Sequence, residues 1–328
     1  EPLDPALTYV TDTDGTTKSF DIEGVIEAEQ SSYVRPTEMI DNVKNATSIK
    51  VGNKVTSIGY KAFAGCKYLT KIDIPSSVQS LGEYAFSQCD ALTELTLPEG
   101  ITVLPKRLFS YQNGWNYGAA SLSKVNLPST LTTIGESAFA GCPSLKSINI
   151  PASVTEIEQF AFNETNLEQV TFNGPVHLGM SAFSGCNNIE KVSIPAGSVL
   201  ETNCFRQNLG RNPNNGLGSA KSTHLIEVTF EGKVIINGYA QFWGCVNLGR
   251  INYLSTELPE FSLEGITESY NAWSSTKAEN AMGYNTRESG NNLFCVPANA
   301  TYTEADLDVF TPVVFNSEYC GFTLSKTL

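Results

Sequence analysis

Apolar residues recur along residues 46–254 in a pattern that returns about every 23 residues. Each copy contains a Phe, usually preceded by Ala. In nearly every copy an apolar residue stands five positions before the Phe, and in uninterrupted copies another stands six positions after it. Eight copies align, with the column Phe63, Phe86, Phe109, Phe139, Phe162, Phe183, Phe205 and Phe242. Self-similarity at a fixed period indicates a repeat architecture, so we expect these Phe residues to form its core.

A pair of apolar residues at alternate positions follows in every copy, such as Ile72 with Ile74 and Leu95 with Leu97. A two-residue period places both side chains on one face of a β-strand. In most copies a Pro comes directly afterwards and ends the predicted strand, as Pro75 does. The segment around the Phe has helical spacing but is too short for an independent helix, so we expect a short helical turn.

A single unit of 23 residues cannot bury both of its apolar edges, whereas stacked units can. With an additional strand expected at residues 46–51, the pattern predicts about nine strands in one parallel sheet, with short helical turns opposite. Residues 1–45 and 255–328 carry no comparable repeat, and we expect them to form an N-terminal and a C-terminal cap on the solenoid of residues 46–254.

The consensus V-x-x-I-G-x-x-A-F-x-x-C-x-x-L-x-x-I-x-I-P, present from residue 46 to about 254, resembles the BspA-like leucine-rich repeat. Residues 292–310 are more distantly similar to the closing unit of that family, a strand followed by Val-Pro and a helix. The resemblance implies a right-handed superhelical solenoid. It also implies a bacterial protein that is secreted or held at the cell surface, where some relatives adhere to host proteins or to other cells.

Charge and composition narrow the classes of partner. The chain has a formal net charge of −13 and no basic run, which argues against nucleic acid or an anionic membrane as the partner. No apolar stretch approaches the ~20 residues that a membrane-spanning helix needs. The only two histidines, His177 and His224, are far apart in sequence, which disfavours metal and catalytic sites, and we expect no cofactor. The extracellular localisation therefore comes from the resemblance alone, because the sequence shows no targeting segment.

Cysteines recur within the repeat, three residues after the Phe: Cys66, Cys89, Cys142, Cys186 and Cys245. Metal ligands must converge on one point, whereas a column distributes them along the stack, so we expect small buried apolar side chains there and at Cys204. Cys295 and Cys320 lie outside the repeats. They form either a disulfide that closes the C-terminal cap or two free thiols.

Two insertions interrupt the repeat at the same point of the coil, near residues 111–120 and 206–224. The first contributes Tyr111, Trp115 and Tyr117, and the second contributes Arg206, Arg211 and Lys221. Aromatic and Arg side chains on loops that project from a rigid scaffold are common binding elements. The alternative is that Trp115 folds back over its own coil. The outward strand positions are mixed and polar, which fits either a solvated face or a weak polar binding face.

These observations favour a non-enzymatic binding or adhesion module that recognises a protein or glycan, such as extracellular matrix or another cell surface. A structural spacer or surface-display scaffold is the alternative. A carboxylate-based hydrolase is a third class, disfavoured because no motif groups the abundant carboxylates into an acid–base pair.

Overall fold

The computed structural model describes residues 2–27, 43–110, 119–207, 224–237, 241–242, 245, 247–262 and 293–295. The chain divides into two compact units, Glu1–Asn166 and Leu167–Leu328, called unit 1 and unit 2 below. This division does not coincide with the predicted caps and solenoid, whose boundaries stay predictions.

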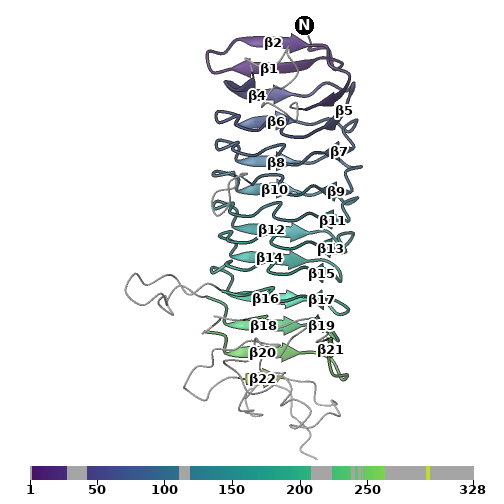
Figure 1. Ribbon diagram of the computed structural model, residues 1–328, viewed down its shortest axis with the longest axis vertical. Helices are drawn as coiled ribbons and strands as arrows, with labels where there is room; N and C mark the ends of the chain where they lie inside the picture. The colour runs from purple at the N-terminus through teal and green to yellow at the C-terminus, as the bar shows by residue number, and fades with distance from the viewer. Residues whose placement is uncertain are drawn as a thin grey trace, which may run out of the picture. The chain divides into compact units, whose positions relative to one another are not determined.

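In unit 1, the strands predicted from the alternating apolar pairs are stacked in parallel, and this stack is called the first ladder (Figure 1). It comprises β4 (Ala46–Lys50), β6 (Lys71–Asp73), β8 (Glu94–Thr96), β10 (Lys124–Asn126) and β12 (Ser147–Ile150). Paired copies are in register, because Ile49 pairs with Ile72 and Leu95 pairs with Val125, whereas strand pairing is interrupted between β6 and β8 and between β10 and β12. The additional strand predicted at residues 46–51 is present as β4.

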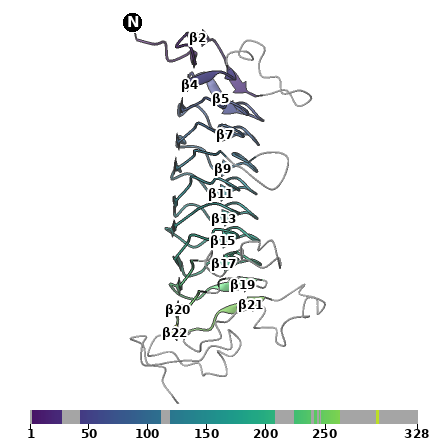
Figure 2. The ribbon, with the colours of Figure 1, turned by 90° about the vertical axis from the view of Figure 1, so that its left-hand side faces the viewer.

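Each coil of unit 1 also contributes a second, shorter strand to a second parallel stack, called the second ladder and visible in Figure 2, in which strand pairing is interrupted once, between the second and third strands. It comprises β5 (Val55–Ile58), β7 (Ser80–Leu81), β9 (Val103–Leu104), β11 (Thr133–Ile134) and β13 (Glu156–Ile157). Each of these strands buries the apolar residue five positions before the Phe, such as Ile58 or Leu104. The prediction of one sheet was therefore wrong, because each coil makes two strands.

The segment around the Phe is a series of turns in the described residues, and the predicted helical turn is also wrong. The residue two positions before the Phe has a φ between 53° and 61° in seven copies: Lys61, Tyr84, Arg107, Ser137, Phe160, Ser181 and Asn203. Left-handed residues of this kind occur singly and do not continue a right-handed helix. The turns instead hydrogen-bond to the next coil, as when the Phe63 amide donates to the Ala85 carbonyl at 2.8 Å.

The first coil of unit 1 is covered by N-terminal strands. Strands β1 (Thr8–Asp12) and β2 (Thr17–Phe20) form an antiparallel hairpin, and β1 also pairs antiparallel with β4. Strand β3 (Gly24–Ile26) pairs in parallel with β5. The hairpin thereby occupies the backbone groups that β4 would otherwise present at an open edge.

Unit 2 repeats both ladders. Its first ladder contains β14 (Gln169–Phe172), β16 (Lys191–Ile194), β18 (Glu227–Phe230), β20 (Arg250–Tyr253) and β22 (Leu293–Cys295). Its second ladder contains β15 (His177–Leu178), β17 (Val199–Leu200), β19 (Ile235–Asn237) and β21 (Glu260–Ser262). The strand expected at the start of residues 292–310 is β22, and β20 pairs with it in parallel. Parallel pairing thus continues past residue 254.

The Phe column forms the centre of the core in both units, and all eight rings are at most 3% exposed. In unit 1 the rings from Phe63 to Phe162 stack with centroids 5.0–5.9 Å apart. In unit 2 Phe183 stacks on Phe205, and Phe205 on Phe242, at 5.3 and 6.0 Å. Burying a side chain of this size contributes about 1.5–3 kcal/mol, so the repeated column is a major source of stability.

Candidate functional site

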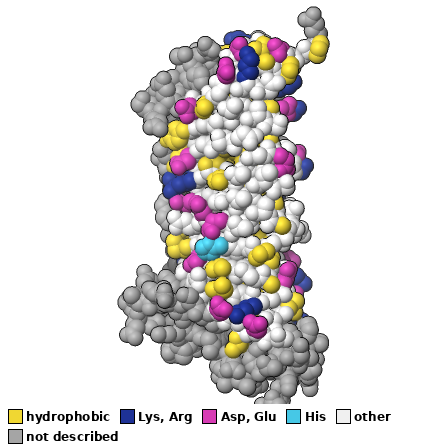
Figure 3. All heavy atoms as spheres, turned by 90° about the vertical axis from the view of Figure 1, so that its right-hand side faces the viewer, with side chains coloured by type: hydrophobic (Ala, Val, Ile, Leu, Met, Phe, Trp, Pro, Cys, Tyr) yellow, Lys and Arg dark blue, Asp and Glu magenta, His cyan; other side chains and the backbone are white. Residues whose placement is uncertain are grey.

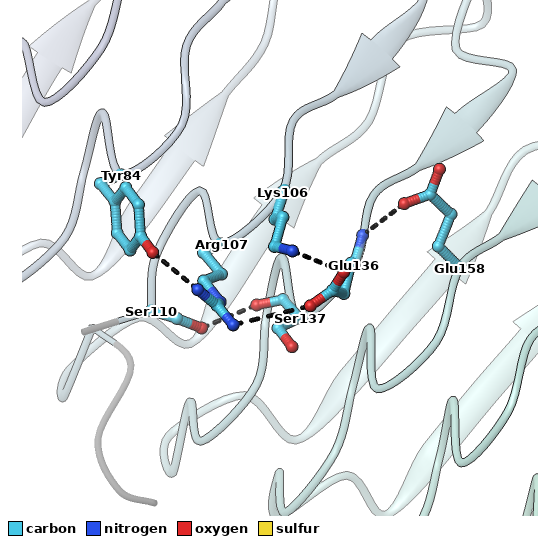
Figure 4. A network of polar contacts seen from close by, with 7 residues as sticks. All are labelled: Tyr84, Lys106, Arg107, Ser110, Glu136, Ser137 and Glu158. Carbon is cyan, nitrogen blue, oxygen red and sulfur yellow. Dashed lines mark hydrogen bonds and ion pairs between the residues drawn. The ribbon is translucent and has the colours of Figure 1, made fainter. Parts of the chain in front are cut away.

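Charged side chains line the turns that follow the second ladder of unit 1. In Figure 3, which views the protein from the side of the second strands, charged groups lie mainly along the margins of the face. In these turns, side chains from successive coils form a polar network (Figure 4), the turn-face network. Its members are Tyr84, Lys106, Arg107, Glu136 and Glu158.

Glu136 is the centre of the turn-face network. Its carboxylate lies 2.7 Å from Lys106 Nζ and 3.6 Å from Arg107 Nη2. Its backbone N–H donates to Glu158 Oε2 at 2.8 Å, so the chain of contacts extends to the next coil. Arg107 Nη1 also donates to the Tyr84 hydroxyl at 2.9 Å. Because both cations already contact Glu136, the network ties neighbouring coils together and does not present an unpaired cationic site.

Tyr84 extends this surface toward the first coil. Its ring meets the ring of Tyr60 edge-on, with centroids 6.0 Å apart, and Lys61 Nζ lies 5.0 and 5.6 Å from the Tyr60 and Tyr84 centroids. Aromatic pairs and cation–π contacts of this kind each contribute on the order of 0.5–1 kcal/mol. The repeat consensus does not require these residues, so they distinguish this part of unit 1 from coils that carry only the consensus residues.

We expect Glu136→Gln to make the fold less stable at neutral pH and to flatten its pH dependence. Burial raises the pKa of Glu136, but hydrogen bonds from Lys106 and Gln159 and the charges of Lys106 and Arg107 together lower it below 4.5. A depressed carboxyl pKa stabilises the fold above the unfolded value, and this contribution disappears as pH falls through the folded pKa. Removing hydrogen bonds to a charged group costs about 1.5–3 kcal/mol.

Urea unfolding of the unsubstituted protein and of Glu136→Gln, at pH 7 and near pH 3, measures the effect. Glu190→Gln, at an exposed position, is the control, and equal losses in both variants would contradict the assignment.

A smaller polar cluster occupies the corresponding turn of unit 2. His177 Nε2 lies 2.9 Å from Glu201 Oε1, and Asn237 Nδ2 donates to the same oxygen at 3.3 Å. These three residues come from three successive coils. As in unit 1, the contacts bridge coils and are partly exposed.

Both insertions leave the coil from buried polar residues just after the Phe column. Ser110, which precedes the first insertion, donates from Oγ to the Ser137 carbonyl at 2.7 Å (Figure 4). Gln207, at the start of the second insertion, donates from Nε2 to the Ile189 carbonyl at 3.5 Å and accepts from the Leu225 amide at 3.4 Å. Each insertion therefore begins at an anchored position.

Of the hypothesised binding residues, only Arg206 lies within the described residues, and it is exposed. The others, Tyr111, Trp115, Tyr117, Arg211 and Lys221, lie outside them. The structure adds the turn-face network, which the sequence analysis did not predict. The available signal was the run of charged and aromatic residues two or three positions before the Phe, such as Tyr60, Tyr84 and Lys106.

The outward face of the first ladder is polar and internally paired. In unit 1, Asn126 Nδ2 donates to Glu94 Oε1 at 3.1 Å and to Thr96 Oγ1 at 2.8 Å, and Lys124 Nζ lies 2.6 Å from Glu94 Oε1. Hydrogen bonds from Lys124 and Asn126 lower the pKa of Glu94. Exposed pairs of this kind contribute little stability, so their main effect is a surface whose polar groups satisfy one another.

The same arrangement recurs in unit 2, where Asn252 Nδ2 donates to Glu227 Oε1 at 3.2 Å and to Thr229 Oγ1 at 3.1 Å. The recurrence follows from the parallel register, which places the Glu, Thr and Asn of adjacent coils side by side.

The column cysteines and Cys204 are buried free thiols. Cys89 Sγ donates to the Phe63 carbonyl at 3.2 Å, and Cys245 Sγ donates to the Phe205 carbonyl at 3.3 Å. The Cys89 and Cys245 thiols therefore each hydrogen-bond to the preceding coil. Cys320 and the side chain of Cys295 lie outside the described residues, so their pairing stays open.

We expect the column thiols to resist alkylation in the folded protein. Burial raises the pKa of Cys142 to about 12 and raises the pKa of Cys245 still further. The thiolate is the reactive form, so labelling at pH 8 should require unfolding. Iodoacetamide treatment with and without urea, followed by mass spectrometry, checks this. Rapid labelling of Cys142 and Cys245 without urea would contradict their burial.

Comparisons with known proteins identify the repeat. A family model described as the BspA type leucine rich repeat region matches residues 37–117 and 113–210, with six copies. A comparison with curated proteins found no match. No helix in the described part of the chain is long and apolar enough to cross a membrane.

Several solved structures are similar to this chain. A leucine-rich repeat protein from Bacteroides ovatus is 21% identical, with 96% of this chain and 99% of that chain covered and a TM-score of 0.47. A leucine rich cell surface protein from Faecalibacterium prausnitzii is 20% identical over 95% and 98% of the two chains, with a TM-score of 0.33. The pneumococcal vaccine antigen PcpA is 14% identical over 90% and 84%, with a TM-score of 0.40.

Proposed function

Because the chain belongs to the BspA type leucine-rich repeat family, we propose that it is a non-enzymatic binding module of a secreted or surface-exposed protein. Its partner is a protein or glycan outside the cell, such as extracellular matrix or the surface of another cell. The coils act as a rigid scaffold, and the two insertions make the contacts. No catalytic step and no cofactor form part of this proposal.

One observation supports the insertions as the contact elements. Both leave the coil just after the Phe column, and both begin at a buried polar residue, Ser110 or Gln207, that hydrogen-bonds to a neighbouring coil. An anchored stem reduces the conformational freedom that a loop loses on binding, which favours affinity. In unit 1 the stem is also tied to the turn of Arg107, since the Ser110 amide donates to the Arg107 carbonyl at 3.2 Å.

The composition of the insertions supports the same proposal. Tyr111, Trp115 and Tyr117 in the first insertion, with Arg206, Arg211 and Lys221 in or beside the second, are the residue types that dominate protein interfaces. The basic residues also fit an acidic partner group, although the chain as a whole carries a net charge of −13.

A structural spacer is the second candidate function, and the paired polar face of the first ladder favours it. Glu94, Lys124 and Asn126 satisfy one another, and so do Glu227 and Asn252. A surface of this kind stays hydrated and needs no partner.

We expect Trp115→Ala to weaken binding at least tenfold, about 1.4 kcal/mol, with little change in melting temperature. The physical reason is that Trp is one of the residue types enriched at interface hot spots, and the repeat itself does not require it. Titration of an identified partner against both proteins measures the change in affinity, and thermal unfolding of both proteins is measured alongside.

Tyr68→Ala is the matched control, because Tyr68 is 54% exposed on the repeat outside both insertions. Unchanged affinity in Trp115→Ala would move the site away from the first insertion, and a large fall in melting temperature would show that Trp115 packs on its coil.

A further inference from the structure

One turn of unit 2 departs from the repeat at the position that ends the first-ladder strand. In five copies a Pro follows this strand directly: Pro75, Pro98, Pro128, Pro151 and Pro195. After β14 the position is instead Asn173, and Gly174 follows it. An Asn-Gly pair is typical of turns, because Gly adopts backbone conformations that other residues avoid. This copy therefore has a conformationally free pair where most copies have a rigid residue.

Asn173 and Gly174 lie on the connection between the two ladders. Strand β14 ends at Phe172 and β15 begins at His177, so neither residue belongs to a strand. Asn173 is exposed to solvent. The chain contains four Asn-Gly pairs, and this is the one whose two residues both lie within the described residues. Water therefore reaches the Asn173 side chain, and the Gly174 amide belongs to no strand ladder.

An Asn carboxamide beside an unhindered backbone amide undergoes an intramolecular reaction. The Gly174 backbone nitrogen attacks Cγ of Asn173 and forms a new C–N bond. The bond from Cγ to the side-chain nitrogen breaks, and that nitrogen leaves as ammonia with the proton that the backbone amide loses. The product is a five-membered succinimide ring. Gly174 favours ring closure, because it has no Cβ to crowd the attacking nitrogen.

We propose that Asn173 is a site of spontaneous deamidation. Water opens the succinimide at either of its two carbonyl carbons. One opening gives Asp at this position. The other gives isoaspartate, in which the main chain runs through the former side-chain carbonyl carbon and is one methylene longer. The reaction needs only water, and both products add a carboxylate to a chain whose net charge is −13.

The isoaspartate product changes a short connection between buried side chains. Phe172, directly before Asn173, is buried, and its ring meets the ring of Phe183 edge-on with centroids 5.7 Å apart. At the other end of the connection Leu178 is fully buried in β15. A main chain that is one methylene longer must therefore be accommodated between two anchored ends.

Asn149 shows that exposure alone does not make such a site. It is also exposed, but it lies within β12, which pairs with β14. The residue that follows it, Ile150, is β-branched and buried. The strand holds the backbone extended, and the stiff Ile150 side chain crowds the attacking nitrogen. Asn149 is therefore the internal control.

Peptide mapping by mass spectrometry, after storage of the full chain at pH 8, tests the proposal. Deamidation exchanges NH₂ for OH, and the resulting mass gain is assigned to the peptide that contains each Asn. Asn173 should convert at least about tenfold faster than Asn149, which corresponds to a difference of about 1.4 kcal/mol between the two activation barriers. The isoaspartate product is distinguished by its resistance to a protease that cuts before Asp.

Two variants separate the chemistry at this turn from other causes of a mass gain. In Gly174→Ala the conversion of Asn173 should slow, because the added Cβ crowds the attacking nitrogen. In Asn173→Gln the mass gain should be lost from this peptide, because a six-membered ring closes much more slowly. Equal rates at Asn173 and Asn149, or an unchanged Asn173, would overturn the proposal. If a variant does not fold, the comparison of the two Asn residues in the unsubstituted protein still decides.

Discussion

Replacing Phe139 with Ala is expected to lower the free energy of unfolding by about 3–5 kcal/mol. The ring of Phe139 has no exposed surface and stacks between the rings of Phe109 and Phe162, at centroid distances of 5.1 and 5.0 Å. Ala would leave a cavity between two coils and would remove both ring contacts. The coils are held in register by backbone ladders, so they cannot collapse freely to fill that cavity.

Urea unfolding followed by circular dichroism measures the loss. Tyr68→Ala is a suitable control, because it also removes an aromatic ring, but from an exposed position. Its expected change is within about 0.5 kcal/mol. A loss below ~1 kcal/mol in Phe139→Ala would mean that the Phe column does not carry the stability of the repeat.

The second large effect is expected from Gly82→Ala, which should destabilise the protein by about 3 kcal/mol. A Cβ at this position would lie only 2.3 Å from the Gly59 carbonyl carbon and 2.4 Å from the Tyr60 amide nitrogen. Both atoms belong to the backbone of the preceding coil, and the Gly82 amide is bound to that coil through the Ile58 carbonyl at 2.7 Å. The coils must therefore separate locally to admit even a methyl group.

Gly249→Ala is the matched control for this prediction. The nearest atom to its added Cβ is the Asn247 carbonyl oxygen at 3.8 Å, an ordinary contact distance. Thermal and urea unfolding of the two variants should differ clearly, with Gly249→Ala close to the unsubstituted protein. Equal stability of both variants would show that the turns around Gly82 can spread without cost.

The sequence predicts the first ladder and the Phe core because both depend on apolar side chains at fixed spacing. The second ladder was not predicted, because most of its strands offer only one buried residue, such as Leu81 or Leu104. Its outward neighbours vary from Ser57 to Val103, so no alternating pattern appears. One apolar position per copy predicts that its side chain is buried, but a strand is predicted only where apolar and polar positions alternate.

The turns were predicted as helical because Ala-Phe-x-x-Cys has helical spacing, but their left-handed residues exclude a helix. Gly65, Gly141 and Gly185, all two positions after the Phe and all with positive φ, were the available signal. The position two residues before the Phe carries no such signal, because residues as different as Lys61 and Phe160 adopt the left-handed conformation there.

The candidate site was less predictable than the core. The turn-face network joins Tyr84, Arg107 and Glu136 from successive coils, and these residues share no type along a column. Their contacts depend on the turn geometry, which places side chains from different copies against one another. The insertions could be located from the sequence, since each interrupts the spacing between the Phe and the next Leu.

To test whether the insertions make the contacts, the intact protein is compared with a variant in which both insertions are shortened to the spacing of the first copy, Phe63 to Leu69. Both proteins are presented to extracellular matrix proteins and to glycan arrays, and their unfolding is monitored in parallel. The account predicts a partner that the intact protein retains and the shortened variant loses, while both unfold at similar temperatures. Equal retention by the two proteins would contradict the claim that the insertions make the contacts.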